Sequence, residues 1–358
     1  MLQIFKMEQP SDLLQSNFGK EDLLKEINQD LNRGQIPDWG KLKNQYPEDL
    51  KNWFYQVIKH DWLKSICENH CFQELIGHHL KFIQVKNFKD NEFLSCPFEE
   101  QDWQLMLEVL AHENKKEWNV RSPECSFPLL IGNENYRMTL IHYSLSPKGG
   151  SKFFLRRHHF NQVNLNHFGL DINQQELIKS IINSGDHFLI AGSTNSGKTT
   201  FLHSCMDLFS SDDHPVILEE TPELESQHPS ATFLTCQDHE NRSIESLIKY
   251  SMRISPTRLV VGEIRGKEAL AYVMLMNTGH KSVYSTLHAS TAIDAVHRLA
   301  QLFCLYSDLP SIKYDEVLRM ICRNVKYVFF LKEKKIQSLI QILGIEGTHP
   351  FYDELISL

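Results

Sequence analysis

Short apolar runs alternate with longer helical segments through the second half of the chain. Each run is bounded by polar, glycine or proline residues, as the strands of a buried sheet are. Several of the segments between them have apolar positions at helical spacing. Strands that alternate with helices are typical of an α/β domain with a largely parallel sheet, and we predict its strands at His187–Ile190, Val216–Leu218, Ala231–Leu234, Leu259–Val261 and Ser282–Ser285.

The first half of the chain has two different patterns. From about residue 19 to 63 a helical spacing, broken at Gly34–Pro37, predicts helices with apolar positions at Leu23, Leu24, Ile27, Leu31, Leu50, Trp53, Phe54, Val57 and Ile58. From about 65 to 155 the pattern is mixed and typical of an α+β domain. It predicts a helix at Gln101–His112 and strands at Leu80–Val85 and Tyr136–Ile141.

Two breaks in these patterns give the domain boundaries. Pro147–Ser151 is rich in turn residues, and the polar, histidine-rich stretch Arg156–Asn166 has the character of a connection. We therefore predict a helical N-terminal extension over residues 1–62 and an α+β domain over 63–157. A linker over 158–168 and an α/β domain over 169–358 follow.

The composition is that of an ordinary globular protein. The chain has 358 residues, 41% of them apolar, and a net charge of −8, which argues against binding nucleic acid over its whole surface. The basic run Lys332–Lys335 is typical of a solvated turn. No apolar stretch approaches the roughly 18 residues of a membrane span, and no signal-peptide pattern opens the chain. The 8 cysteines include no C-x-x-C pair, so we expect a cytoplasmic protein with reduced thiols.

The strongest single motif follows the apolar run Phe188–Ile190. It fits the pattern G-x-x-x-x-G-K-[ST], and the predicted phosphate-binding residues are Gly192, Ser193, Thr194, Asn195, Ser196, Gly197, Lys198, Thr199 and Thr200. The two glycines let the backbone wrap tightly, so that its amide N–H groups point at phosphate oxygens. Lys198 is expected to reach the β- and γ-phosphates, and the Thr199 hydroxyl to bind Mg²⁺. The motif predicts a site for a nucleoside triphosphate.

Hydrolysis also requires a group that orients water, and a carboxylate follows one of the predicted strands. Leu259–Val261 leads directly into Gly262 and Glu263. The carboxyl edge of an open α/β sheet is where its ligands bind, so Glu263 is expected to face the nucleotide. We predict that Glu263 positions water or acts as the general base.

Two further segments carry candidate chemistry. Val216–Leu218 leads into a cluster of carboxylates, namely Glu219, Glu220 and Glu223. Like charges so close together favour a role linked to Mg²⁺, although solvated acidic loops are common. The predicted strand at Ser282–Ser285 has a histidine on each side, and His280 or His288 is a candidate contact of the γ-phosphate.

These segments together resemble the ATPases of bacterial type II and type IV systems for secretion, conjugation and pilus assembly. The similarity is greatest to the conjugative and tight-adherence pilus branch. It covers roughly residues 60 to 345, and weaker similarity includes Glu134–Arg137 and Phe154–Arg157. It rests on blocks in the same order: the phosphate-binding loop (P-loop), an Asp-box-like Leu218–Leu224, a Walker-B-like Arg253–Arg265 and a His-box-like Gly279–Ala289.

The resemblance implies a homohexameric ATPase with a PAS-like domain, a RecA-like P-loop ATPase domain, and ATP with Mg²⁺ bound between them. It implies a motor that powers protein secretion or pilus assembly. Such a motor is cytoplasmic and peripheral to the inner membrane, works on an inner-membrane platform protein and binds no nucleic acid directly. The resemblance implies that Glu263 is the Walker B glutamate and that His288 is the His-box contact. It implies that Glu223 is the Asp-box carboxylate beside the Mg²⁺ held by Thr199. Arg137 and Arg156 are implied to be the arginines brought towards the nucleotide.

The sequence departs from the family pattern at two positions. Thr257 stands where the family often has an aspartate before Walker B, and Glu220 stands where an aspartate is usual. We expect these departures to affect the turnover rate rather than to remove hydrolysis. The alternatives are a pilus-retraction ATPase and a nucleotide-binding regulator with weak hydrolysis. A RecA-like nucleic-acid motor is disfavoured by the net charge and by the lack of an aromatic and basic strand-binding stretch.

Overall fold

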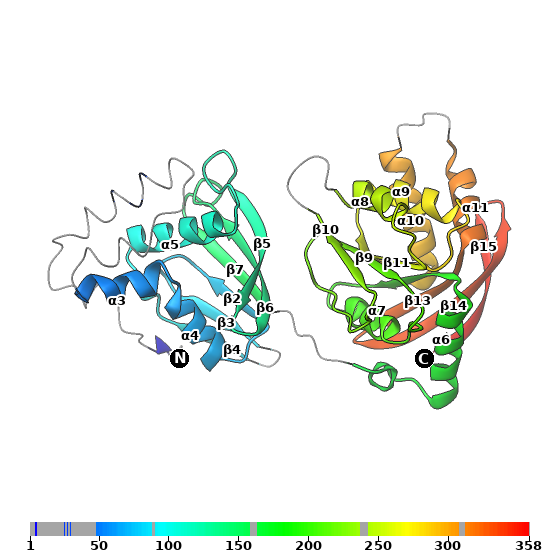
Figure 1. Cartoon of the computed structure of the whole chain (residues 1–358), viewed down its shortest axis with the longest axis horizontal. Coiled ribbons are helices and arrows are strands. Elements are labelled where there is room, and N and C mark those ends of the chain that lie inside the picture. Colours follow the sequence, from blue (N-terminus) through cyan, green and yellow to red (C-terminus); the bar gives the residue numbers. More distant parts are fainter. Residues whose placement is uncertain are drawn as a thin grey trace. The chain divides into compact units, whose positions relative to one another are not determined.

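The chain divides into two compact units, Met1–His159 and Phe160–Leu358, which are described separately (Figure 1). The computed structural model describes residues 4–5, 25, 27, 29, 48–87, 90–157, 163–236, 243–307 and 312–357. Within these residues no helix is long and apolar enough to cross a membrane. Residues 158–162 of the predicted linker and the predicted break at Gly34–Pro37 lie outside the described part, as do Leu23, Leu24 and Leu31, whereas Lys25, Ile27 and Gln29 are helical.

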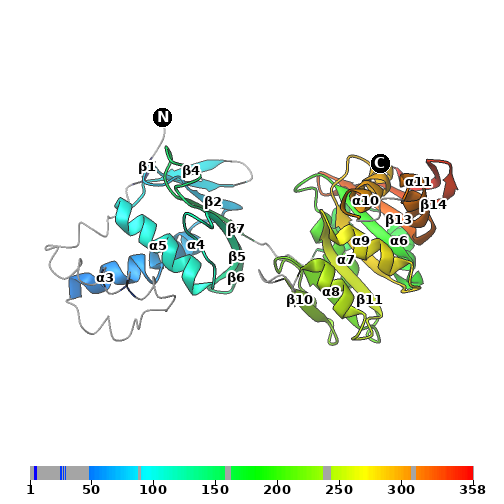
Figure 2. The same ribbon diagram turned by 90° about the horizontal axis from the view of Figure 1, so that it is seen from above.

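Unit 1 is built on a seven-stranded sheet with the order β1-β4-β3-β2-β7-β6-β5. Neighbouring strands are antiparallel except for β1 and β4, which are parallel. The strands are β1 (Ile4–Phe5), β2 (Glu74–Gly77), β3 (Ile83–Lys86), β4 (Asn91–Leu94), β5 (Glu124–Ile131), β6 (Glu134–Ile141) and β7 (Lys152–Arg157). Three helices cover one face of this sheet, α3 (Glu48–Val57), α4 (Asp61–Asn69) and α5 (Glu100–Glu113) (Figures 1 and 2).

The elements predicted between about residues 65 and 155 are confirmed with small shifts. α5 contains the predicted helix Gln101–His112, and β6 contains the predicted strand Tyr136–Ile141. The strand predicted at Leu80–Val85 begins later, at Ile83, because the residues before it form the turn that follows β2. The turn reverses the chain so that β3 can pair with β2 in antiparallel register.

Alternation along the strands places one side of the sheet against the helices. Leu75, Val85, Met138 and Leu155 form one row across neighbouring strands, and all are fully buried. The same core cluster contains tryptophans from each of the three helices, namely Trp53, Trp62 and Trp103. The helices that precede the α+β elements therefore share one core with them.

Unit 2 is built on an eight-stranded sheet with the order β10-β9-β11-β12-β8-β13-β14-β15. The strands from β10 to β13 run parallel, and β14 and β15 continue the sheet as antiparallel strands. The strands are β8 (His187–Gly192), β9 (Pro215–Glu219), β10 (Thr232–Thr235), β11 (Arg258–Ile264), β12 (Val283–Leu287), β13 (Val325–Lys332), β14 (Lys335–Glu346) and β15 (His349–Ser357). This confirms the α/β domain and each of its predicted strands, with shifts of one or a few residues.

Helices cover both faces of this sheet, and the central strand β8 shows how. Phe188 and Ile190 pack in the core cluster that includes α6 (Ile172–Ser184) and α7 (Lys198–Met206). Leu189 and Ala191 pack in the opposite cluster, which includes α8 (Ile244–Ser251), α9 (Glu268–Met276), α10 (Ala292–Tyr306) and α11 (Tyr314–Asn324). A strand buried on both faces reads as a continuous apolar run, which is why β8 was predictable.

The strands after β12 were not predicted, although their connection was. β13 and β14 form a hairpin whose two turn residues, Glu333 and Lys334, have φ of 52° and 61°. Left-handed conformations at both central positions give the turn type that matches the twist of paired strands. The predicted solvated turn at Lys332–Lys335 is therefore confirmed, and its function is to join two strands.

We expect Trp53→Ala to destabilise unit 1 by about 3–5 kcal/mol, because it removes a fully buried indole from the core. All 5 tryptophans of the chain precede residue 119, so tryptophan fluorescence during urea unfolding reports on this unit. Glu68→Ala, at an exposed position of α4, is the control and should change stability by about 0.5 kcal/mol or less. If Trp53→Ala and Glu68→Ala unfold at the same midpoint concentration of urea, α3 does not belong to this core.

Candidate active site

The P-loop connects the carboxyl end of β8 to the start of α7. A Cβ atom at Gly192 would clash with the Leu331 carbonyl oxygen and the Ser196 hydroxyl, so only glycine permits this close approach. Gly197 has φ of 95° and caps α7, and Asn195 is also left-handed, with φ of 66°. These conformations wrap the loop around the N-terminus of α7, where unpaired amide groups favour an anion.

The β13–β14 hairpin supports this loop from outside. The Lys334 N–H donates to the Ser196 carbonyl oxygen at 3.1 Å, and the Lys334 backbone lies directly against Gly197. Inside the loop the Ser196 N–H donates to the Ser193 carbonyl oxygen at 3.3 Å. The loop is therefore held by its own chain on one side and by the hairpin turn on the other.

Lys198 is the buried cation of the loop, with 7% of its surface exposed. Its Nζ donates to the carbonyl oxygens of Gly192 at 3.0 Å and Ser193 at 2.8 Å, and it lies 3.5 Å from His288 Nδ1. Burial lowers the pKa of Lys198, and the Glu263 charge opposes this shift. The amine therefore sits among acceptors that a phosphate group can replace.

His288 and Glu263 extend this contact along the sheet edge. Glu263 lies near the end of β11, and His288 directly follows β12, the strand between β11 and β8. His288 Nε2 lies 2.8 Å from Glu263 Oε1. Since Nδ1 accepts from the Lys198 amine, the neutral imidazole carries its proton on Nε2, facing Glu263. Burial and the Lys198 charge lower the pKa of His288, which favours this neutral form.

A local irregularity directs Glu263 towards the site. The register of β11 and β12 shifts between Val261 and Glu263, and the Thr286 hydroxyl donates to the Gly262 carbonyl oxygen at 2.7 Å. An extra residue in one strand redirects the side chains that follow it. Glu263 Oε2 accepts from Arg265 Nη2 at 2.5 Å, whereas the buried Oε1 lies 2.8 Å from His288 Nε2 without a hydrogen bond among the described residues.

The acidic loop after β9 contains a buried carboxyl group. Glu219 is 6% exposed, and its Oε1 accepts from the N–H groups of Glu223 at 3.0 Å and Leu224 at 2.9 Å. Burial raises the pKa of Glu219 to about 8, against the effect of these two hydrogen bonds. Glu219 therefore fixes the backbone of the loop that carries Glu220 and Glu223.

The structure brings together some of the predicted residues and separates others. Lys198, Glu263 and His288 are in contact, and Glu223 lies half-buried in the loop after β9. His280, the alternative to His288, precedes β12, and its charge acts on the pKa of His187 at the opposite edge of the sheet.

The predicted arginines belong to unit 1. Arg137 on β6 and Arg156 on β7 are cross-strand partners, with Arg156 exposed and Arg137 half-buried. The adjacent Arg157 forms an ion pair with Glu134 at 2.9 Å. The sheet therefore places Arg137 and Arg156 side by side, and their role at a nucleotide stays a prediction.

Sequence reasoning assigned no role to Arg265, and it included Glu219 in an acidic cluster with a role linked to Mg²⁺, whereas the buried Glu219 binds the backbone of its own loop. Arg265 follows Glu263 by two positions at the end of a strand, and a period of two places both side chains on one face. This spacing of two residues was the sequence signal that could have linked Arg265 to Glu263. For Glu219 the signal was its position as the last residue of an apolar strand, where its side chain cannot easily reach water.

The departure at Thr257 lies away from the site. Its hydroxyl donates to Asp213 Oδ1 at 3.0 Å and accepts from the His214 N–H at 2.7 Å. These residues precede β9 and β11, so they lie at the amino edge of the parallel strands, opposite the P-loop. These contacts of Thr257 lie at the amino edge, so they do not support the expectation that Thr257 affects the turnover rate.

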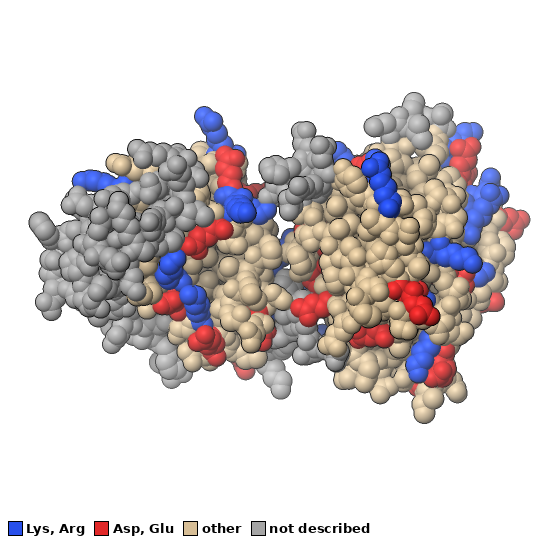
Figure 3. Space-filling model, in the orientation of Figure 1, with Lys and Arg blue, Asp and Glu red and all other residues tan. Residues whose placement is uncertain are grey.

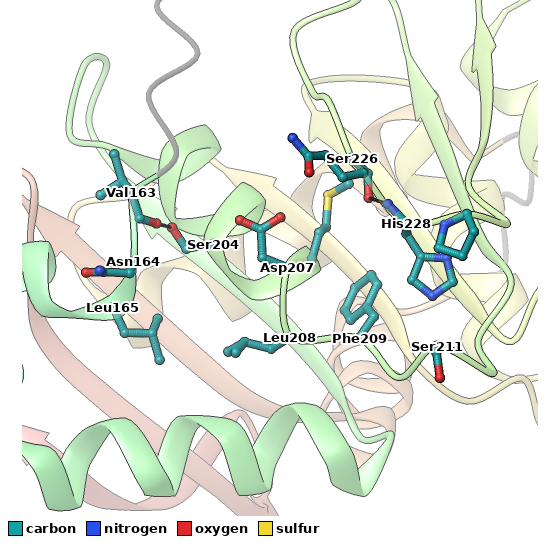
Figure 4. A pocket seen from close by; sticks show the side chains of 13 residues that line it. Val163, Asn164, Leu165, Ser204, Asp207, Leu208, Phe209, Ser211, Ser226 and His228 are labelled. Atoms are coloured by element: carbon teal, nitrogen blue, oxygen red, sulfur yellow. Dashed lines mark hydrogen bonds between the residues drawn. The ribbon is translucent and has the colours of Figure 1, made fainter.

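A cavity of about 620 Å³ opens at the far end of α7 (Figure 4). Asp207, Phe209 and His228 line it together with Val163 and Ser204, and the Ser204 hydroxyl donates to the Val163 carbonyl oxygen. The P-loop is at the N-terminus of α7, whereas this cavity is at its C-terminal end. The cavity is thus distinct from the phosphate-binding loop.

The residues of the loop fit a phosphate-bearing ligand. The Ser196 hydroxyl is buried, and among the described residues it has no hydrogen-bond partner. Gly192 and Gly197 form a cradle that side chains would fill, and Lys198 lies at its base. Within the described part of the chain no group of three or more His, Cys, Asp and Glu residues forms a metal site.

A P-loop at the end of a central parallel strand, with a carboxylate at the same sheet edge, defines the class of P-loop nucleotide-binding α/β proteins. The chain belongs to the type II/IV secretion system protein family, whose sequence profile matches residues 87–350. The resemblance drawn from the sequence motifs is confirmed, and with it the assignment to ATP-binding secretion and pilus ATPases.

Curated relatives are named as conjugal transfer proteins, and solved structures share the fold. The chain is 30% identical to a probable conjugal transfer protein TrbB of Sinorhizobium fredii over 67% of its length and 73% of the relative. It is 31% identical to the conjugal transfer protein TrbB of Rhizobium radiobacter over 69% of its length and 76% of the relative. The fold is shared with the ATPase DotB of Legionella pneumophila, at 15% identity and a TM-score of 0.58 over 83% of this chain and 80% of DotB. It is also shared with the pilus retraction motor PilT with bound ADP, at 18% identity and a TM-score of 0.56 over 83% of this chain and 82% of PilT.

We expect the stability of unit 2 to fall as the pH rises from about 4.5 to about 8 because of Glu219. The folded state keeps the Glu219 proton over this range, whereas the unfolded state releases it, so folding is favoured at the acidic end. The free energy of unfolding of wild type, measured relative to that of Glu219→Gln, should fall by about 1.4 kcal/mol per pH unit over this range. Urea unfolding followed by circular dichroism provides the measurement.

Glu225→Gln is the control, because Glu225 is an exposed carboxylate in the same loop. Its stability should follow that of wild type at every pH. A difference between wild type and Glu219→Gln that does not change with pH would contradict the buried, protonated state of Glu219.

Proposed function

We propose that the protein hydrolyses ATP with Mg²⁺ and works as a homohexameric motor for protein secretion or pilus assembly. The observation that carries this proposal is the contact series from Lys198 through His288 to Glu263 along one sheet edge. It joins a phosphate-binding amine to a carboxylate suited to orienting water. Membership of the secretion family supports the same conclusion.

Each side chain has one task in this proposal. The P-loop amides and Lys198 bind the β- and γ-phosphates. Thr199 and Glu223 would hold Mg²⁺, which would supply positive charge to neutralise the phosphate oxygens. Glu263 orients a water molecule towards the γ-phosphorus. The bond between the γ-phosphorus and the β–γ bridging oxygen breaks, ADP leaves with that oxygen, and water supplies the oxygen and protons of the inorganic phosphate. His288 keeps Lys198 and Glu263 in register.

The motor function extends this chemistry to assembly. Relatives at 30–31% identity are named as conjugal transfer proteins, and a relative from Bartonella henselae at 31% identity over 44% of the chain is named as a type IV secretion system protein. We therefore propose that the chain acts at the cytoplasmic face of the inner membrane, on a platform protein and without binding nucleic acid. Unit 1 is proposed to be the PAS-like domain and unit 2 the RecA-like domain.

A regulator with weak hydrolysis is the second candidate. Both oxygens of Glu263 are contacted, one by His288 and the other by Arg265, so water must compete for them. This arrangement favours a slow basal rate. A retraction motor is the third candidate, and the similarity to PilT concerns the fold alone.

The test is an ATPase assay on wild-type protein separated by size, with and without Mg²⁺. We expect activity in a hexameric fraction and its loss when Mg²⁺ is removed. Lys198→Ala should abolish both nucleotide binding and hydrolysis, because it removes the charge at the phosphates. Glu263→Gln should bind a fluorescent nucleotide normally but hydrolyse at least about 100-fold more slowly, because it cannot accept a proton.

Lys179→Ala is the control for loss of a lysine, since Lys179 is a surface residue of α6 paired with Glu176. It should keep wild-type activity and binding. Nucleotide binding without hydrolysis in every fraction would refute the motor and favour the regulator. Full activity of Glu263→Gln would assign water positioning to another residue.

The role of the unit 1 arginines has a separate test. We expect Arg137→Ala and Arg156→Ala each to lower kcat about 10³-fold, the lower end of the effect of an arginine finger. Lys152→Ala is the control, because it removes a cation from the same strand as Arg156. If all three variants have the same kcat, these arginines do not act on the nucleotide.

A further inference from the structure

Arg265 lies between two carboxylates that belong to different strands. Its Nη2 donates to Glu263 Oε2 at 2.5 Å, and its Nη1 lies 3.9 Å from Glu220 Oε2 in the loop after β9. The exposed fractions of these side chains are 54% for Arg265, 60% for Glu220 and 22% for Glu263. One guanidinium therefore has a more buried partner and a more exposed partner within reach.

The backbone of Arg265 is fixed, so that only its side chain can move between these partners. The Glu268 carboxylate, at the start of α9, accepts from the N–H groups of Arg265 and Gly266, the latter at 2.7 Å. A carboxylate at a helix N-terminus is also stabilised by the helix dipole. The Arg265 side chain thus turns about an anchored Cα atom.

Hydrolysis requires that one contact of Glu263 is released. Glu263 Oε1 faces His288, whose other nitrogen is bound to Lys198 and so to the P-loop. Oε2 is contacted by Arg265, which has a second acceptor nearby. Water can therefore reach Oε2 when the guanidinium turns away, whereas access to Oε1 would require the contact with the P-loop to be broken.

Glu220 is suited to receive the guanidinium. Hydrogen bonding to Glu263 raises the pKa of Arg265 most, and the charges of Glu220 and Glu223 act in the same direction, so the cation stays charged in either position. The Arg265 side chain is 54% exposed, so solvent screens its ion pair with Glu263 and its pairing with Glu220.

We propose that Arg265 is a positioning residue for the proposed ATP hydrolysis, holding Glu263 in the resting state and transferring to Glu220 during turnover. The transfer opens Glu263 Oε2 to the water molecule, and the return of Arg265 resets the site. This proposal rests on the proposed function and assigns Glu220 an effect that acts only through Arg265.

A double-mutant cycle tests this dependence. Glu220→Gln removes the second acceptor, and we expect kcat to fall about tenfold with KM for ATP unchanged, a coupling typical of residues in contact. Arg265→Ala removes the group that covers Glu263 Oε2, so its kcat is expected to be no lower than that of wild type. The double variant should match Arg265→Ala alone, and Glu220→Asp, which keeps the charge, should recover most of the wild-type kcat. Binding of a fluorescent nucleotide should be the same for all of them.

Glu245 and Lys249, an ion pair at 2.6 Å on α8, provide the matched control. Glu245→Gln, Lys249→Ala and their combination should leave kcat within about twofold of wild type. Elution volume and thermal unfolding of each variant verify folding, and Arg265→Lys replaces Arg265→Ala in the cycle if the alanine variant is unfolded.

The outcomes separate this proposal from the proposed function. If wild type hydrolyses ATP and the effects of Glu220→Gln and Arg265→Ala on kcat multiply in the double variant, the proposed role of Arg265 is overturned. The proposed function is not affected by that result. A wild-type kcat for Glu220→Gln would also overturn the proposed role of Arg265. Absence of hydrolysis by wild type would overturn the proposed function and this proposal with it.

Discussion

The site depends on the parallel pairing of β8, β12 and β11. Because these strands run in the same direction, the P-loop and His288 follow strand ends and Glu263 lies near one, all at a single sheet edge. β12 lies between the other two strands, so His288 is placed between Lys198 and Glu263, with contacts of 3.5 and 2.8 Å. A register shift of one residue would turn each of these side chains to the opposite face.

The pairing also explains how so many charges share a small region. Along the edge, positive and negative groups alternate from Lys198 to Glu263 and from Arg265 to Glu220, with a neutral imidazole between the first two. Figure 3 shows the acidic and basic side chains on one face of the molecule. Burial disfavours the charge of Lys198, but the nearby carboxylate offsets part of this cost. Burial raises the pKa of Glu219 to about 8, so the neutral form of the carboxyl group that holds the acidic loop is favoured at neutral and lower pH.

Local patterns predicted the parallel strands of unit 2 and the P-loop, because runs such as β8 are buried on both faces and the loop has fixed glycine positions. The pairing of strands distant in sequence could not be predicted in this way. The family resemblance implied His288 rather than His280, and the sheet order shows why, because His288 follows the strand beside β8 and meets Lys198. Arg265 was within a recognised motif, yet its two partners depend on the β11 irregularity and on a loop from another strand. The hairpin β13–β14 was missed because only its turn has a strong local signal.

That hairpin has a consequence for how the protein is made. The P-loop is supported by the Lys334 N–H and by the close approach of Leu331 to Gly192, and both residues lie more than 130 positions later in the chain. During synthesis the ribosome releases the loop well before the residues that support it. A nascent chain therefore completes its nucleotide cradle only after β13 and β14 have emerged, which delays ATP binding until nearly the whole of unit 2 can fold.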